Sequence, residues 1–170
     1  AEVSVSMGVG DLSLFPLKES NTLIAGEISS EGAAVRSRST VRGNTAIYSI
    51  EHNNPVMVPF EDAWNWDLGL TTHIPLELDT SMGVGSMGLI LDEMMLEDLS
   101  ISQGVGEVEV ILPDGDYRAE VDQAIGQIVI EVPKNVPIRL NISKAISGFA
   151  IPSDFEKQND YYYSPGARGA

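Results

Sequence analysis

Cysteine is absent from the 170-residue sequence. Its absence excludes a disulfide framework, a thiolate metal site and a cysteine nucleophile. Aromatic residues are also scarce, at 6%, although hydrophobic residues make up 43% of the chain. A core built from this composition must therefore be aliphatic. No apolar run is long enough to cross a bilayer as a helix, and no stretch carries the start and stop signals of a long helix.

Basic residues are few. Ten Lys and Arg residues oppose 25 Asp and Glu residues, which gives a formal net charge of -15. This balance repels the phosphate backbone of nucleic acid and the anionic surface of membranes, so we expect neither as a partner. The first residue, Ala1, falls inside an alternating pattern. We therefore expect a trimmed chain, with a signal or membrane anchor upstream of it.

A unit of about 20 residues recurs along the chain. In Leu99–Pro113, alternating apolar residues lead to Gly104-Val105-Gly106, after which the alternation resumes and a proline ends the unit. Four further copies share this arrangement. They centre on Gly8-Val9-Gly10, Gly83-Val84-Gly85, Ala124-Ile125-Gly126 and Ala145-Ile146-Ser147.

Each unit predicts two strands joined at a corner. Alternation places one row of side chains inside and one row in solvent. Glycine or alanine allows the bend, and we expect the aliphatic residue between them to plug the core. One unit cannot bury its apolar face alone, so copies must stack. The sequence predicts an all-β fold, a right-handed β-helix or β-solenoid, with a β-sandwich of the same strands as the alternative. The equivalence of the corners favours the solenoid.

We expect residues 1–170 to form a single all-β repeat domain. Regular solenoid coils are predicted over 76–152, a less regular part or cap over 17–75, and a C-terminal cap or linker over 153–170. Open solenoid ends expose unpaired strand edges. The pattern therefore leaves open a homo-oligomer that forms through the coil beginning at Val3 or the coil ending near Ile151.

Four segments carry a family resemblance, namely SVSMGVGDLSL, WDLGLTTHIPLELDTSMGVG, LEDLSISQGVGEVEVILP and AEVDQAIGQIVIEVP. In these segments the chain resembles the bacterial toast-rack domain of unknown function, and the related C-terminal domain of LiaF-like cell-wall-active antibiotic response proteins. The resemblance implies a sheet-rich solenoid outside the cytoplasmic membrane, with a role in envelope organisation or stress sensing. It supplies no catalytic residues. Relatives continue into a further strand, which implies that the last coil is incomplete at Ala170.

Catalytic signatures are missing from the sequence. The two histidines, His52 and His73, lie outside any triad-like motif, and no nucleophile elbow surrounds a serine. Glu107 and Glu109 could be considered as paired carboxylates, but the alternation places both in the solvent row of an acidic protein. We therefore expect no enzyme.

Metal and cofactor signatures are equally weak. Asp114 and Asp116 could offer oxygen ligands to calcium, but Pro-Asp-Gly is first of all a turn sequence. The Gly-x-Gly corners resemble phosphate loops, although neither a helix nor a lysine follows them. We expect no cofactor and no metal.

Two groups of residues are candidates for surface binding. Trp64 and Trp66 alternate, so they share a face that could stack on sugar rings or could close the end of the core. Arg36, Arg38 and Arg42 lie on one row of a predicted strand and could bind an acidic polymer or a partner, or could simply be solvated.

The predicted function is that of a non-catalytic extracytoplasmic domain of the cell envelope. It would act as a scaffold or as a protein-interaction or stress-sensing module, with a protein or envelope component as partner. The alternative is a carbohydrate-binding module or a polysaccharide-acting β-helix protein, a suggestion that rests on fold analogy.

Overall fold

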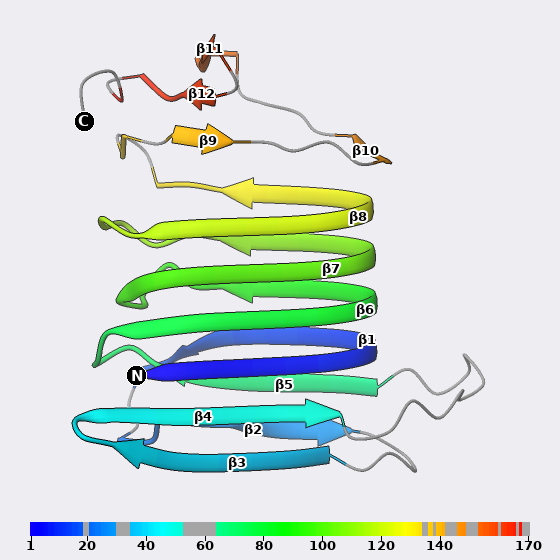
Figure 1. The fold of residues 1–170 in the computed structure, drawn as a ribbon, viewed down its shortest axis with the longest axis vertical. Coiled ribbons are helices and arrows are strands. Elements are labelled where there is room, and N and C mark those ends of the chain that lie inside the picture. Colours follow the sequence, from blue (N-terminus) through cyan, green and yellow to red (C-terminus); the bar gives the residue numbers. More distant parts are fainter. Residues whose placement is uncertain are drawn as a thin grey trace.

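The described part of the chain consists of strands and their connections (Figure 1). The computed structural model describes residues 1–18, 21–29, 35–52, 64–133, 136–137, 139–141, 146–148, 153–159, 161–165 and 167. Its strands are β1 (Glu2–Leu17), β2 (Ile24–Ser29), β3 (Val35–Arg42), β4 (Thr45–His52), β5 (Trp64–Thr71), β6 (Leu76–Ile90), β7 (Leu96–Ile111), β8 (Arg118–Glu131), β9 (Arg139–Asn141), β10 (Ile146–Gly148), β11 (Glu156–Gln158) and β12 (Tyr161–Tyr163). Within these ranges there is no helix that could span a bilayer. The all-β prediction is confirmed.

Four long strands, β1, β6, β7 and β8, form the coils. Each runs along one face of the molecule, turns at a corner and returns along the opposite face (Figure 1). The coils pair in parallel and in register, so that Met87 of β6 lies between Leu12 of β1 and Val108 of β7. From β6 to β8 the chain rises as a right-handed coil, the hand that parallel crossovers favour. Parallel pairing of equivalent strands is the arrangement of a solenoid, whereas hairpins would have paired them antiparallel.

Aliphatic rows fill the space between the two faces. Leu14, Leu89 and Val110 occupy equivalent positions in successive coils, and each is at most 1% exposed. Burial of one such side chain contributes about 1.5–3 kcal/mol, which explains why the alternation fixes the register so firmly. Thr80 is a polar residue within this packing, and its hydroxyl donates a hydrogen bond to the carbonyl of Ser100 at 3.4 Å.

The coil below β1 is assembled from two separate strands. β4 pairs in parallel with the first half of β1, and β5 pairs in parallel with its second half. β3 then pairs antiparallel with β4, and β2 pairs antiparallel with β5. β1 therefore lies inside the stack, and the expectation of an open coil edge beginning at Val3 is wrong. The reason is that residues after β1 fold back beneath it before the chain continues upward into β6.

The corner aliphatic residues were expected to plug the core, and this expectation is also wrong. Val9, Val84, Val105 and Ile125 are 36%, 40%, 42% and 47% exposed. The inward position before each bend is already taken by the residue two places earlier, such as Met7 or Gln103, which is buried. The chain then turns so sharply that the aliphatic residue lies on the outside of the bend.

Beyond β8 the stack continues with short strands. β10 pairs in parallel with β8 through Ile146 and Ile125, which extends the corner by one further rung. β11, β12 and β9 form a separate antiparallel sheet. The predicted end of a coil near Ile151 and the predicted incomplete coil at Ala170 lie outside the described residues.

Candidate interaction surface

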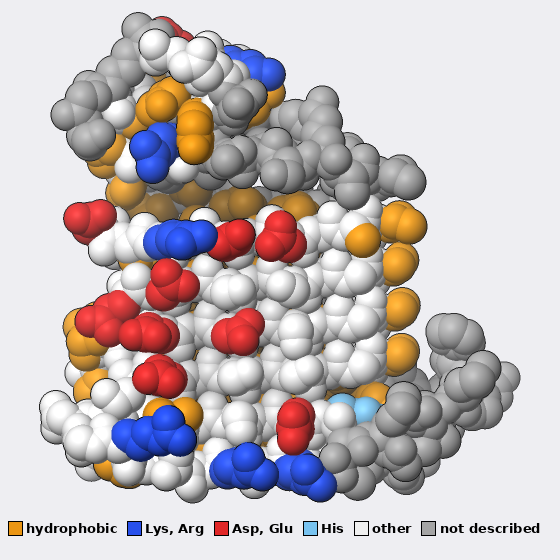
Figure 2. Space-filling model, in the orientation of Figure 1, with side chains coloured by type: hydrophobic (Ala, Val, Ile, Leu, Met, Phe, Trp, Pro, Cys, Tyr) orange, Lys and Arg blue, Asp and Glu red, His pale blue; other side chains and the backbone are white. Residues whose placement is uncertain are grey.

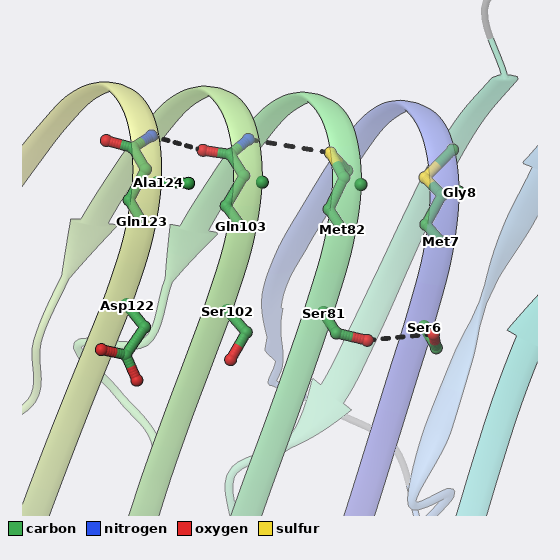
Figure 3. Close-up of a pocket in the computed structure, with 12 residues that line it drawn as sticks. Ser6, Met7, Gly8, Ser81, Met82, Ser102, Gln103, Asp122, Gln123 and Ala124 are labelled. Atoms are coloured by element: carbon green, nitrogen blue, oxygen red, sulfur yellow. Dashed lines mark hydrogen bonds between the residues drawn. The ribbon is translucent and has the colours of Figure 1, made fainter. Parts of the chain in front are cut away.

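An open groove runs along the stack beside the corners of the four long strands (Figure 3). We call it the corner groove; its volume is about 690 Å³. Each strand contributes three consecutive residues, which are Ser6–Gly8, Ser81–Gly83, Ser102–Gly104 and Asp122–Ala124. In Figure 3 the serines and Asp122 form one row, while the methionines and glutamines form a second row that points the other way.

The floor of the corner groove is formed by glycine in three of the four strands and by Ala124 in the fourth. At Gly83 and Gly104 a side chain would strike the neighbouring coil. A Cβ at Gly104 would lie 2.5 Å from the carbonyl oxygen of Gly83. Two residues on, Gly106 has φ of +142°, and a Cβ there would lie 1.8 Å from the oxygen of Gly85. Gly10, Gly85 and Gly126 share this left-handed conformation. The corner therefore requires glycine at this position in each of the four long strands.

Amide side chains on the inner side of the corner tie successive coils together. Gln103, which is only 4% exposed, donates from Nε2 to the carbonyl oxygen of Gly85 at 2.7 Å. Gln123 donates from Nε2 to Oε1 of Gln103 at 2.6 Å and to the oxygen of Gly106 at 2.9 Å. These bonds hold three consecutive corners in line, which gives the outer surface of the corner a fixed geometry.

The exposed aliphatic residues of the corner form a continuous column. We call Val9, Val84, Val105 and Ile125 the corner ridge, and Figure 2 shows their column at one edge of the molecule. Parallel strands in register place successive members about 4.8 Å apart. A contiguous exposed apolar row on a soluble protein is typical of a contact surface, whereas scattered apolar residues are not.

The corner is also the uncharged part of an acidic molecule. The segments SMGVG, SMGVGS, SQGVG and QAIGQ, which build the four corners, contain no ionisable side chain. Exposed carboxylates flank these segments directly, at Asp11, Glu107 and Asp122. Of the residues that line the corner groove, Asp122 is the one that can carry charge. The ridge side chains are therefore uncharged, with carboxylates two or three residues away from Val9, Val105 and Ile125.

The two tryptophans lie in the core and are not surface groups. Trp64 and Trp66 are 4% and 0% exposed. β5 pairs with β1 on one side and with β2 on the other, and its alternate side chains point into the core. The expectation that they could stack on sugar rings is therefore wrong for the folded chain. The ring of His52 packs on Trp64 with centroids 3.8 Å apart, and burial lowers the pKa of His52 below its usual value.

The three arginines lie on β3, the outermost strand of the stack. All three are exposed, and Arg36 lies 3.9 Å from Glu51. Both partners of this pair are more than half exposed, so the pair contributes little to stability. The structure does not bring Arg36, Arg38 and Arg42 together with the tryptophans or with the corner groove. Their binding of an acidic partner stays a prediction.

The remaining candidates are dispersed. His52 ends β4 near the corner, whereas His73 follows the far end of β5. Glu107 and Glu109 are exposed on the outer row of β7, and Asp114 and Asp116 are exposed in the loop after it. Across the described ranges, no three His, Asp or Glu side chains converge as metal ligands.

The corner ridge was missed although the sequence carries a signal for it. Inward residues occupy odd positions before the first corner, as in Val5 and Met7, and even positions after it, as in Leu12 and Leu14. This change of phase means that one residue of the corner must leave the inward row. Val9 is that residue, because Gly10 continues the row toward Leu12.

Comparisons with known proteins agree with this architecture. A chain from Clostridium sporogenes ATCC 15579, provisionally described as a cell adhesion protein, superposes with a TM-score of 0.76. The match covers 99% of this chain and 82% of that chain at 19% sequence identity, which establishes likeness of fold alone. A search of curated proteins found no match. The family model described as the N-terminal domain of toast_rack, DUF2154, matches residues 1–131, and the chain therefore belongs to the toast-rack family.

Proposed function

We propose that this chain is a non-catalytic interaction module displayed outside the cytoplasmic membrane, and that it contacts a protein partner through the corner ridge. The observation that carries the proposal is the ridge itself, four aliphatic side chains that occupy equivalent positions of successive coils and are 36–47% exposed. Rows of this kind are a cost to solubility unless they meet a partner.

The chemistry of the corner groove supports a binding role. General acid–base and nucleophilic catalysis need titratable or nucleophilic groups within hydrogen-bond reach of each other, often with a perturbed pKa. The groove offers serines, glycines, methionines and glutamines, with Asp122 as its ionisable member. Its longest hydrogen-bond network, through Gln103 and Gln123, ends on backbone carbonyls and so serves the fold.

An extracytoplasmic location is supported by the structural neighbour. The structural neighbour from Clostridium sporogenes is provisionally described as a cell adhesion protein, a role that belongs outside the cell. Burial of Trp64 and Trp66 removes the observation on which a carbohydrate-binding role depended.

The location is tested by thiol labelling in intact cells. Because this chain lacks cysteine, Val105→Cys gives it a single, exposed thiol, and the unsubstituted protein labelled in parallel reports any thiol elsewhere. A membrane-impermeant maleimide should label it in unbroken cells, while a cytoplasmic control protein stays unlabelled. Labelling that requires cell lysis would contradict the proposal.

The contact is tested by site-specific photocrosslinking in the same cells. A photoreactive residue at Val84 or Val105 should give a discrete protein adduct. The matched control is Ile90, which is 45% exposed at the end of β6, away from the corner. Equal adduct patterns from the ridge and from Ile90, or none from the ridge, would show that the ridge is not a specific contact surface.

A further inference from the structure

The corner ridge lies directly beside the corner groove, so the surface is self-complementary. The ridge of one copy can fit into the groove of a second copy, and the reverse contact can form at the same time. In each of the four long strands the ridge residue follows the groove residues in sequence, as Val105 follows Gly104. A twofold axis parallel to the solenoid axis would therefore lay the ridge of each copy over the groove of the other. Val105 of one copy would then meet Gly104 of its partner, and the reverse contact would form at the same rung.

The spacing of the rungs favours a second solenoid over other partners. Successive ridge residues lie about 4.8 Å apart, and a second copy repeats the same interval, so contact at one rung implies contact at all four. A helix advances about 5.4 Å per turn and would fall out of step by about 2 Å across three intervals. An extended strand presents alternate side chains at a still longer interval.

The ridge side chains carry no charge, although each chain has a net charge of -15. Exposed carboxylates lie two or three residues from the ridge, at Asp11, Glu107 and Asp122. They add a like-charge repulsion to the approach of a second copy, which limits the strength of the pair.

On these grounds we infer that the corner ridge and corner groove bind a second copy of this chain, side by side and with parallel solenoid axes. This inference rests on the proposed function and names its partner. The ridge spans only about 14 Å between its first and last rung, far less than an interface of about 800 Å² per partner needs. The pair is therefore weak in dilute solution and forms readily when copies are held on one surface, where their effective concentration is high.

Parallel axes give the pair a further property. Both copies present the same end of the solenoid to the same side, which suits two chains that are anchored to one membrane. An antiparallel pair would instead suit chains on facing membranes.

The test uses single-cysteine variants of the purified chain, which has no cysteine of its own. Val105→Cys should be cross-linked to a dimer by mild oxidation several-fold faster than Ile90→Cys at the same high concentration. Ile90 is a matched control because it is similarly exposed, 45% against 42%, but lies on another face. Adding Val84→Asp to the Val105→Cys variant should slow the reaction several-fold, because two carboxylates then enter the contact; circular dichroism checks that the fold is kept.

Equal cross-linking rates for the two cysteine variants, or no effect of Val84→Asp in a folded protein, would overturn the inference. The two proposals fail in distinguishable ways. Suppose that Val105→Cys forms disulfide dimers no faster than Ile90→Cys in purified protein, yet a photoreactive residue at position 105 cross-links to another protein in cells. The second copy is then excluded as the partner, and the proposed function stands. If neither adduct forms, both are wrong.

Discussion

Gly106 shows at the scale of one residue why the corners repeat. Its φ of +142° and the carbonyl oxygen of Gly85 leave no room for a side chain. Gly104 is crowded less severely, by the oxygen of Gly83, and the equivalent position of the next coil is Ala124. The two glycines of one corner therefore differ in why they are needed. The second is required by its backbone conformation, and the first by the close approach of the neighbouring coil.

Substitution of the two glycines should separate these roles. Gly106→Ala should lower the free energy of unfolding by at least ~3 kcal/mol, since strain and a clash combine. Gly104→Ala should cost only about 1 kcal/mol, because a small displacement of the backbone accommodates a methyl group. Urea unfolding followed by circular dichroism measures both. Similar losses for the two variants would contradict the distinction.

The glutamines of the inner row allow a second prediction at this scale. Gln103→Met should lower the free energy of unfolding by about 1–3 kcal/mol, because it removes the donor to Gly85 and the acceptor of Gln123. The double variant Gln103→Met with Gln123→Met should cost less than the sum of the single variants, since no amide is left half-paired. Methionine already occupies the equivalent position of two earlier coils, at Met7 and Met82. Strictly additive losses in a double-mutant cycle would show that the two amides act independently.

At the scale of an element, the loop after β7 carries a titratable anchor. The hydroxyl of Tyr117 donates a hydrogen bond to the carbonyl oxygen of Pro113 at 2.9 Å. Burial, together with the nearby Asp114 carboxylate, raises the pKa of Tyr117 to about 12. The usual pKa of an unfolded tyrosine is about 10. The folded state therefore holds the proton over a range in which the unfolded state releases it.

This difference predicts a loss of stability in alkali. The contribution of Tyr117 is fully present below about pH 10 and is lost as the pH rises from 10 toward 12. In the Tyr117→Phe variant the free energy of unfolding should depend less steeply on pH over that range, because the titrating hydroxyl is gone. The other tyrosines and the lysines are common to both proteins, so the difference between the two curves reports Tyr117. Urea titrations at several pH values make the comparison. Parallel curves for the two proteins would exclude the anchor.

Strand pairing shows which part of the fold sequence reasoning could reach. The alternation and the repeated corners of β6, β7 and β8 predicted parallel stacking because all the necessary information is local to each unit. The coil made of β4 and β5 was not predicted, since its two halves come from separate strands and neither carries the Gly-x-Gly corner. Their pairing with β1 depends on contacts between residues about 50 apart, such as Leu12 with Trp66, which no local pattern reports.

The candidate site was predicted less well than the fold. Arg36, Arg38 and Arg42 were expected on the solvent row of a strand; they are exposed, but so are the alternate residues of β3, because this strand lies at the edge of the stack. For Trp64 and Trp66 the sequence left both burial and exposure open, because two aromatic residues at alternate positions have the same sequence pattern whether they face the core or solvent. The corner ridge was placed on the wrong side, because the direction of a side chain at a bend depends on the bend itself.

At the scale of the whole molecule, stacking converts one local property into an extended surface. A single exposed valine at a bend would carry little meaning, but four in register make a ridge with a groove beside it. The same stacking spreads carboxylates along the faces, one of which is visible in Figure 2. The ridge side chains themselves are uncharged and remain exposed at the edge.

The central claim is that the corner aliphatic residues face solvent while their neighbours on the same strand face the core. Single-cysteine labelling tests it most directly, with Val105→Cys compared with Val108→Cys, a position that is 0% exposed three residues away. The account predicts that the thiol at 105 reacts with a soluble disulfide reagent nearly as fast as a free thiol, while the thiol at 108 is protected until the protein unfolds. Protection at 105, or equally fast reaction at both positions in the folded protein, would contradict it.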